Sequence, residues 1–426
     1  SGRNTSPTEA TGPPTGTVNG RPRQDMYDRT ICVMGRCIDS EDGIMVYAHN
    51  LLRAMAALDP ASRYVILLRT PKHAHSFDGL PNVEIQVRPA RVKTVWDQVV
   101  VPLAARRVRA DIIFNPKFSL PLLTRRPGVF VLHGSDWYVN PRNYRWWDNL
   151  YIRLMMPLYC YKANHLLAIS QRVVDDLVKY ARIDAKKVTV TYAAPSAHFS
   201  PVTDHTRLRE FALRYRLPEH FILTVARAYH TGHSHLPEYP GGNNENLVAG
   251  YRHYRANGGS LPFVVVGKDI ERYLRNRGFR DGDLEGIHFT GFIPHGEINN
   301  IYSLAEFFIL ATLNESFCLP LVEAMASGCP AIVPSTGACP EVAGGAARLV
   351  DPRDAAAIGD AMTEFANSVQ VRERMRAAGL ERVRMFTWER TATLTLNALA
   401  GVTRKAKETT ERAPQSVALL GKGHNL

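Results

Sequence analysis

Short apolar runs alternate with longer amphipathic segments along the chain from residue 29 onward. In the first half, runs with the length and composition of buried β-strands fall at residues 30–34, 64–68, 83–87, 111–115, 129–133, 165–170 and 188–192. Helical patterns lie between them, at residues 44–58, 95–108, 146–164 and 171–181. This β/α alternation predicts a parallel sheet covered by helices on both faces.

The alternation lapses at residues 193–204, which include Pro195 and Pro201, and then starts again. The second set of strand-like runs lies at residues 221–226, 263–267, 288–291, 307–312 and 330–334. Helical patterns cover residues 245–255, 297–305, 320–327 and, last, about 388–400. We therefore predict two Rossmann-like α/β domains with a boundary near residue 200. Ligands of open parallel sheets bind at the carboxyl ends of the strands, so two such domains imply a ligand cleft between them.

A length of 426 residues suits two domains, and the hydrophobic share of 45% is ordinary for a globular protein. No apolar run approaches the roughly 18 residues that span a bilayer. Residues 1–24 are rich in Ser, Thr, Pro and Gly without an apolar core, so we expect a disordered leader rather than a secretory signal. We expect domains at 25–200 and 201–387, a closing helix at 388–403 and a flexible polar tail at 404–426.

The six cysteines form no C-x-x-C pair, and several lie in strand-like runs. We expect buried free thiols in a reducing compartment, which indicates a cytoplasmic protein.

The formal net charge of +12 favours polyanionic ligands. Basic residues gather at 88–109 against the single acid Asp97, beside Trp96 and the apolar stretch 99–103. That mixture suits peripheral contact with an anionic membrane, and a solvated helix face explains it equally well. Nucleic acid is not expected, because no motif for reading bases or grooves is present.

The most informative segment is residues 314–328, NESFCLPLVEAMASG, which follows a strand and enters a helix with Pro320 in its first turn. Free backbone N–H groups near Cys318, Leu319 and Leu321, with the helix dipole, suit a phosphate. Glu315 and Glu323 would instead accept hydrogen bonds from sugar hydroxyls on either side of that phosphate, as in a nucleotide sugar. The residues alone equally allow Glu315 as a helix cap and Glu323 as a surface residue.

This segment resembles the E-x7-E motif of retaining glycosyltransferase family 4. Further motifs of that family recur in order, at residues 42–47, 111–115, 129–136, 167–170, 187–192, 288–294, 339–352 and 386–389. The resemblance spans roughly residues 29–402 and is stronger in the second half. It implies a GT-B fold, in which two Rossmann-like domains face each other across a cleft and the C-terminal helix crosses back to the first domain. It also implies transfer of a sugar from a nucleotide-diphosphate sugar to a hydroxyl of a glycan or lipid-linked acceptor, with retention of configuration and without a metal or other cofactor.

Carried onto this sequence, the resemblance implies that Glu323 binds the donor ribose and that Glu315 contacts the transferred sugar. Gly43 would let its loop approach the donor phosphates, and Arg227 would bind them with its planar charged fork. His133, at a strand end, would lie near the reacting sugar, although a histidine packed under a loop is the plainer interpretation. The remaining donor contacts would come from Phe292 and Ile293 at the base, and from Phe317, Cys318 and Leu319.

Two departures from the family pattern concern charge. The usual lysine after the arginine is replaced by Glu245, and Lys268 is a substitute for it. The usual aspartate after the strand-end histidine is absent at Gly134, and Asp136 is positioned to compensate.

The loop at residues 230–243 contains His230, His233 and His235, which could form a metal cluster, but its glycines favour a lid and no metal site is expected. In the family pattern the aromatic residues at 138–147 face the cleft, where they would stack on an acceptor sugar or line a lipid path; plain packing explains them equally well. No two carboxylates are placed as nucleophile and acid/base, which favours front-face attack with the leaving diphosphate as base. Two alternatives stay open: a degenerate GT-B protein that binds nucleotide sugars without turnover, motivated by Glu245, and a GT-B phosphorylase or epimerase.

Overall fold

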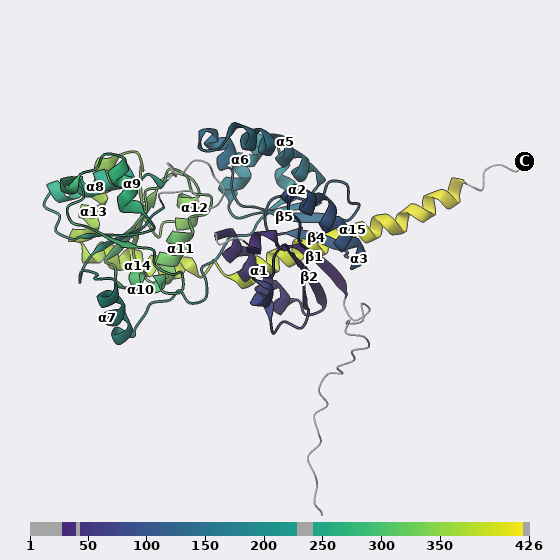
Figure 1. Cartoon of the computed structure of the whole chain (residues 1–426), viewed down its shortest axis with the longest axis horizontal. Coiled ribbons are helices and arrows are strands. Elements are labelled where there is room, and N and C mark those ends of the chain that lie inside the picture. The colour runs from purple at the N-terminus through teal and green to yellow at the C-terminus, as the bar shows by residue number, and fades with distance from the viewer. Residues whose placement is uncertain (1–27, 40–42, 228–241, 421–426) are drawn as a thin grey trace, which may run out of the picture.

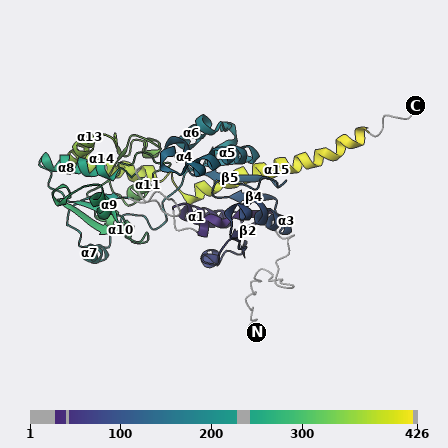
Figure 2. The same ribbon diagram turned by 45° about the horizontal axis from the view of Figure 1, so that its top comes forward.

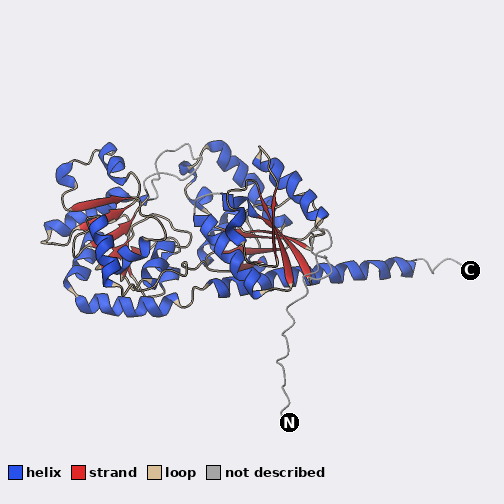
Figure 3. Ribbon diagram, turned by 60° about the horizontal axis from the view of Figure 1, so that its bottom comes forward, coloured by secondary structure: helices blue, strands red, loops and turns tan. Residues whose placement is uncertain are grey.

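The computed structural model describes residues 28–39, 43–227 and 242–420, with side chains as far as Glu408 apart from that of Lys407. Within these residues two parallel sheets form two separate domains, coloured purple to blue and teal to yellow-green in Figure 1. Figure 3 shows that helices cover both faces of each sheet. The predicted pair of α/β domains is confirmed.

The first domain's described residues form a seven-stranded sheet in the order β3-β2-β1-β4-β5-β6-β7. Every strand pairs in parallel. The side chains of the five central strands are almost all buried, as expected when helices cover both faces of a sheet, whereas those of the edge strands β3 and β7 are partly exposed. The strands are β1 (Arg29–Met34), β2 (Ser62–Leu68), β3 (Val83–Val87), β4 (Ile112–Asn115), β5 (Gly128–Leu132), β6 (His165–Ala168) and β7 (Val188–Val190).

The second domain's described residues form a six-stranded parallel sheet in the order β10-β9-β8-β11-β12-β13. Counted from its own first strand, this is the 3-2-1-4-5-6 order of dinucleotide-binding sheets, which places a ligand at the point where the order reverses. The strands are β8 (Ile222–Val225), β9 (Phe263–Val266), β10 (Ile287–Gly291), β11 (Phe307–Ile309), β12 (Ala331–Pro334) and β13 (Arg348–Val350).

The helices follow the strands in regular alternation. Side-chain oxygens cap several of them: Ser170 accepts from the Val173 amide at the start of α6, and Asp354 accepts from the Ala357 amide at the start of α13. The helices are α1 (Gly43–Leu58), α2 (Lys93–Val95), α3 (Val101–Arg107), α4 (Asp136–Val139), α5 (Trp146–Lys162), α6 (Gln171–Ala181), α7 (His205–Arg214), α8 (Asn244–Ala256), α9 (Ile270–Asn276), α10 (Ile298–Leu304), α11 (Leu319–Ala326), α12 (Cys339–Ala343), α13 (Ala355–Asn367), α14 (Val369–Val383) and α15 (Trp388–Leu420).

Each strand predicted from the apolar pattern forms within three residues of its expected bounds. The single helix expected at 95–108 is instead divided by a π-helical turn at Trp96–Val100, followed by Pro102, whose missing N–H breaks the regular ladder. Strand β13 and helices α4, α7, α9, α12, α13 and α14 were not predicted, and β13 and α14 show why most clearly. β13 has three residues beginning with an exposed arginine, and α14 has only one buried residue, so neither has a strong periodic pattern.

Helix α15 leaves the second domain and packs along α1 of the first, as the resemblance implied (Figure 1). At its start, the Trp388 indole donates to the Pro195 carbonyl at 3.0 Å and the Thr391 hydroxyl donates to the Tyr192 carbonyl at 2.6 Å. The helix continues to Leu420, so the predicted end at residue 403 is wrong. Its extension contains Ala, Lys, Glu and Arg, which favour helices, and it projects past the first domain in Figure 3.

All six cysteines are free and buried, which confirms the interpretation as inert thiols. Among the helices that the structure describes, none is long and apolar enough to cross a bilayer.

Candidate active site

A cavity of about 370 Å³ lies between the two domains, at the carboxyl ends of their strands. Figure 2 shows α1 and α4 of the first domain and α11 of the second at the facing edges. Eight of the predicted site residues line this cavity: Gly43, His133, Arg227, Glu315, Phe317, Cys318, Leu319 and Glu323. Asp136, Tyr144 and Trp388 line it as well.

Two helices begin at this cavity, one from each domain. Helix α1 begins at Gly43, and a Cβ built there would meet no atom of the described residues within 4 Å, so this backbone faces open space. Helix α11 begins at Leu319, after Cys318 in a left-handed conformation with φ of 72°. The Leu321 N–H donates to the Cys318 carbonyl at 3.1 Å, so it is already bonded, unlike the free amide that the sequence predicted. Both N-termini direct positive dipole ends toward the cavity.

Glu315 is fixed through its backbone. The Ala338 N–H donates to the Glu315 carbonyl at 2.8 Å, and a Cβ on Gly337 would lie only 2.6 Å from the Glu315 nitrogen. Gly337 has a φ of 64°, so both its conformation and its space require glycine. Burial raises the pKa of the Glu315 carboxyl, and Thr312 and Arg227 oppose that shift. Sequence reasoning missed the Gly337 turn, because no pattern joined it to residue 315.

Glu323 lies on the first turns of α11 and is 5% exposed. Its Oε1 lies 3.1 Å from the Nε2 of His295, a residue that the sequence analysis did not single out. The hydrogen bond to Glu323 raises the pKa of His295, while burial raises the pKa of Glu323. The hydrogen bond therefore holds the Glu323 side chain in place, and Glu323 is a buried cavity residue rather than a surface one.

Arg227 follows β8 and lines the cavity near Glu315, whose pKa its charge lowers. The Arg227 carbonyl accepts from the Asn244 side-chain amide at 3.0 Å. That bond fixes the arginine to the first residue of α8, at the point where the strand order of the second sheet reverses.

His133 follows β5 and lines the cavity from the first domain. Its Nε2 lies 2.6 Å from the Pro116 carbonyl, which can only accept, so Nε2 holds a proton. The ring meets Tyr47 edge to face at a centroid distance of 4.7 Å. The histidine is thus both packed under a loop and exposed to the cavity, so its two interpretations are compatible.

Asp136 is the centre of a hydrogen-bond cluster at the cavity wall. It accepts from Asn140 at 2.6 Å, from the Tyr144 hydroxyl at 2.9 Å and from Asn314 at 3.2 Å. The last bond crosses between the domains. The position expected to compensate for Gly134 therefore fixes the wall and joins the two halves of the site. A side chain at Gly134 itself would meet the Ser316 hydroxyl at 2.7 Å.

Further contacts close the cleft. The Ser170 hydroxyl donates to the Ser316 carbonyl at 2.6 Å. The Glu341 carboxylate accepts from the Gln171 amide at 2.7 Å and the Arg172 amide at 3.1 Å, and so caps the N-terminus of α6 from the opposite domain.

Three predicted donor residues do not line the cavity. Lys268 is exposed after β9, Phe292 is 69% exposed, and Ile293 is buried. The loop that contains Phe292 and Ile293 reaches the site through His295 instead.

Glu245, the replacement for the family lysine, accepts from the Tyr273 hydroxyl at 2.8 Å and from the Arg277 guanidinium at 2.9 Å. Its charge is therefore balanced away from the cavity lining. His230, His233 and His235 lie outside the described residues, and no metal-binding cluster occurs within the described ones.

Comparison with known proteins agrees with this geometry. Residues 42–194 match the Glycosyltransferase Family 4 model, and residues 246–368 match the Glycosyl transferases group 1 model. The serotype-specific mannosyltransferase WbdA of Escherichia coli is 26% identical over 263 residues, which cover 60% of this chain and 31% of that protein. The O-antigen chain mannosyltransferase B of Escherichia coli is 24% identical over 303 residues, covering 69% of this chain and 75% of that protein. The chain thus spans about a third of the length of the first of these relatives.

Solved structures share the fold. A glycosyltransferase from Rickettsia africae superposes with a TM-score of 0.67 at 15% identity, covering 88% of this chain and 99% of that one. HepE from Anabaena, in complex with UDP and glucose, gives a TM-score of 0.64 at 14% identity, covering 88% of this chain and all of the other.

The two facing sheets, the cleft between them and the crossing helix define a glycosyltransferase with the GT-B fold. The matched domains place the chain with the glycosyltransferases of family 4.

Proposed function

We propose that this protein transfers a sugar, and specifically mannose, from a nucleotide-diphosphate sugar to a hydroxyl of a glycan or lipid-linked acceptor. The observation that carries the proposal is the interdomain cavity, in which two helix N-termini and Arg227 meet two carboxylates. The mannosyl group follows from the mannosyltransferase relatives, and the nucleotide from HepE, which binds UDP.

The donor diphosphate would lie between the N-termini of α1 and α11. Backbone N–H groups at a helix start bind anions, and the positive ends of both dipoles add to the charge of Arg227. Glu323 and Glu315 would accept hydrogen bonds from the ribose and from the transferred sugar, because an ionised carboxylate repels phosphate oxygens.

The reaction would proceed at the front face of the donor sugar with retention of configuration. The bond from the sugar carbon to the diphosphate oxygen breaks as the acceptor oxygen attacks the same face, and the acceptor proton passes to the departing diphosphate. Arg227 and the two helix starts would stabilise the charge that develops on that leaving group. His133 donates from Nε2 to the Pro116 carbonyl, which fixes the ring at the cavity wall, where it would orient the transferred sugar. The contacts of Glu341 and Asn314 across the cleft would exclude water.

Glu245 is paired with Arg277 and does not line the cavity, so it places no negative charge at the proposed diphosphate site. Lys268 does not line the cavity either, so the lysine that Glu245 replaces has no substitute there among the described residues and the degenerate-binder alternative stays open. Peripheral contact of the basic segment at 88–109 with an anionic membrane fits a lipid-linked acceptor and is part of the proposal.

The first experiment is thermal unfolding with UDP, GDP, ADP and their mannose and glucose derivatives, with and without EDTA. A ligand that binds only the folded state raises the midpoint, so one nucleotide should stabilise selectively and should do so in EDTA. Incubation with the matching nucleotide sugar should then release the nucleoside diphosphate slowly by hydrolysis. Absence of stabilisation by every nucleotide at millimolar concentration would refute the proposal.

A further inference from the structure

Helix α5 exposes an unusual number of large apolar side chains. Seven of its residues are between 41% and 87% exposed: Trp146, Trp147, Leu150, Tyr151, Leu154, Leu158 and Tyr161. On the other side, Ile152, Met156 and Tyr159 are buried against the domain. A helix that is apolar on both faces normally lies inside a protein or a membrane. The outer face of α5 is therefore suited to contact with a further apolar surface outside the domain.

The exposed side chains form a single stripe. At 3.6 residues per turn they occupy an arc of about 140°, opposite the buried face. No charged residue falls within this arc; Asp148, Arg153 and Lys162 lie at its edges. Tryptophan begins the stripe and tyrosine ends it, and these two residues favour the boundary between hydrocarbon and water.

A second apolar group lies beside the C-terminal end of α5. The Lys162 ammonium donates to the Thr124 carbonyl at 2.6 Å, and the Gln98 side chain bonds the Leu120 carbonyl and the Leu122 amide. The loop at 116–127 thus joins α5 to the π-turn before α3. It presents Leu123, which is 95% exposed, beside the half-exposed side chains of Val99 and Leu103.

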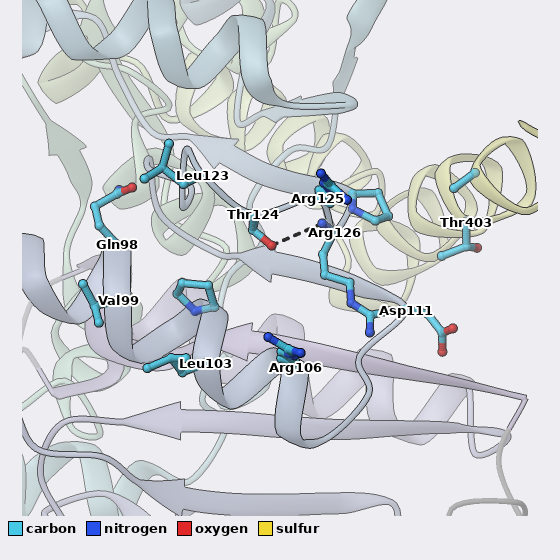
Figure 4. A pocket seen from close by; sticks show the side chains of 13 residues that line it. Gln98, Val99, Leu103, Arg106, Asp111, Leu123, Thr124, Arg125, Arg126 and Thr403 are labelled. Atoms are coloured by element: carbon cyan, nitrogen blue, oxygen red, sulfur yellow. Dashed lines mark hydrogen bonds between the residues drawn. The ribbon is translucent and has the colours of Figure 1, made fainter. Parts of the chain in front are cut away.

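These three residues border a cavity of about 1020 Å³ that also contains Arg106, Arg125 and Arg126 (Figure 4). It lies at the amino ends of β4 and β5, at the opposite edge of the sheet from the active site. Apolar side chains at the mouth and three guanidinium groups within suit an amphiphile with an anionic headgroup, because guanidinium binds phosphate with two parallel hydrogen bonds.

The charge around both features is mostly positive, and Asp111 is the one acidic residue among the described residues that line the cavity. Segments 88–109, 116–127 and 142–162 contain thirteen basic residues and two acidic ones, and one of the acids, Asp97, is buried and paired with Arg36. A protein partner is not excluded by apolar surface alone, but this excess of positive charge around an aromatic-ended apolar stripe matches an anionic bilayer.

The stripe also leads to the active site. Tyr144 lines the interdomain cavity, and Trp146 starts α5 only two residues later. Trp137, another cavity residue, meets the Tyr144 ring at 5.7 Å. A surface that rests on lipid would therefore hold the mouth of the active site at the membrane.

We propose that the outer face of α5, with Val99, Leu103 and Leu123, rests on an anionic bilayer, and that the arginine-lined cavity receives a phospholipid headgroup. Resting on the proposed transferase function, this assigns the acceptor to the lipid-anchored class. The acceptor's reactive hydroxyl then enters past Trp146 and Trp147.

The test is flotation of the full chain with vesicles of phosphatidylcholine, with and without phosphatidylglycerol. The wild type should float with the anionic vesicles, and brominated lipid should quench its tryptophan fluorescence. Leu154→Glu with Leu158→Glu should lower partitioning by about tenfold or more, because two charges must enter the interface. Leu213→Glu, on α7 of the second domain and 70% exposed in the wild type, is the matched control and should float normally.

Arg125→Gln with Arg126→Gln should reduce binding to anionic vesicles by about fivefold per charge and leave binding to neutral vesicles unchanged. Nucleotide stabilisation, measured by thermal unfolding, should survive in every variant. A wild type that stays off anionic vesicles but is still stabilised by a nucleotide overturns the membrane inference alone. A wild type that floats without nucleotide stabilisation overturns the proposed function alone. A lipid-free dimer that the Leu154 and Leu158 substitutions dissociate would show a protein interface and refute the bilayer.

Discussion

Replacement of Glu323 by alanine is the most direct test of the donor site. Glu323 is 5% exposed, lines the cavity, and has its Oε1 held 3.1 Å from the Nε2 of His295, so its carboxylate is fixed where it would accept from the ribose hydroxyls. We expect Glu323→Ala to weaken nucleotide binding strongly while the fold persists, because α11 stays packed through its other buried side chains.

The size of the effect follows from these contacts. A hydrogen bond to a charged group contributes about 1.5–3 kcal/mol, and burial here reduces screening by water. Loss of one to two such bonds, about 3 kcal/mol in all, raises the dissociation constant roughly 100-fold. His295 loses its partner as well, so part of the change will appear as a lower thermal midpoint of the free protein.

Calorimetric titration of the stabilising nucleoside diphosphate measures this change. The 2′-deoxy and 3′-deoxy forms of the same nucleotide complete a double-mutant cycle between protein and ligand. If Glu323 binds the ribose, one deoxy form should bind the wild type more weakly than the ribonucleotide does. In the Glu323→Ala variant, the same deoxy form and the ribonucleotide should bind equally well. Glu364→Ala, at a surface carboxylate paired with the exposed Arg348, is the matched control and should leave affinity unchanged.

Unchanged affinity in a folded Glu323→Ala protein would refute the ribose assignment. So would a deoxy penalty of equal size in the variant and the wild type, since the hydroxyl would then have another partner.

Three further outcomes are expected. The hydrogen bond to Glu323 raises the pKa of His295 above its usual 6.5. The pairing therefore stabilises the fold fully below about pH 6.5, and this stabilisation is lost as the pH rises through the higher pKa of the folded state. Thermal midpoints measured between about pH 6 and 9 should show this fall, and His295→Gln should flatten it. An equal slope in both proteins would contradict the pairing. Arg227→Gln should lower the rate of sugar transfer or donor hydrolysis roughly 100-fold in steady-state assays, and a rate within threefold of wild type would exclude the arginine as the leaving-group cation. Glu341→Ala should raise the ratio of open to closed protein about fivefold, because α6 loses the cap that Glu341 supplies from the opposite domain, about 1 kcal/mol. Small-angle scattering should then show a larger radius of gyration. Identical scattering would show that the cap does not hold the cleft closed.

The sequence determined the fold class because its signals are local. Alternating buried strands and amphipathic helices, interrupted at residues 193–204, were enough to predict two parallel sheets, and the E-x7-E segment was enough to locate α11 and the two glutamates of the motif, Glu315 before the helix and Glu323 within it. The end of α15 was mispredicted, since helix propensity without an apolar stripe gives no periodic signal.

Only the tertiary structure decided which residues act together. Arg277 neutralises Glu245 across 32 positions, His295 meets Glu323 across 28, and Glu341 caps α6 across 170. The sequence predicted a helix at residues 146–164 but not the exposure of its outer apolar face, because periodicity shows which residues share a face and not whether that face is covered. Pairing and exposure are properties of how distant segments meet, so they are fixed by packing and absent from any local pattern.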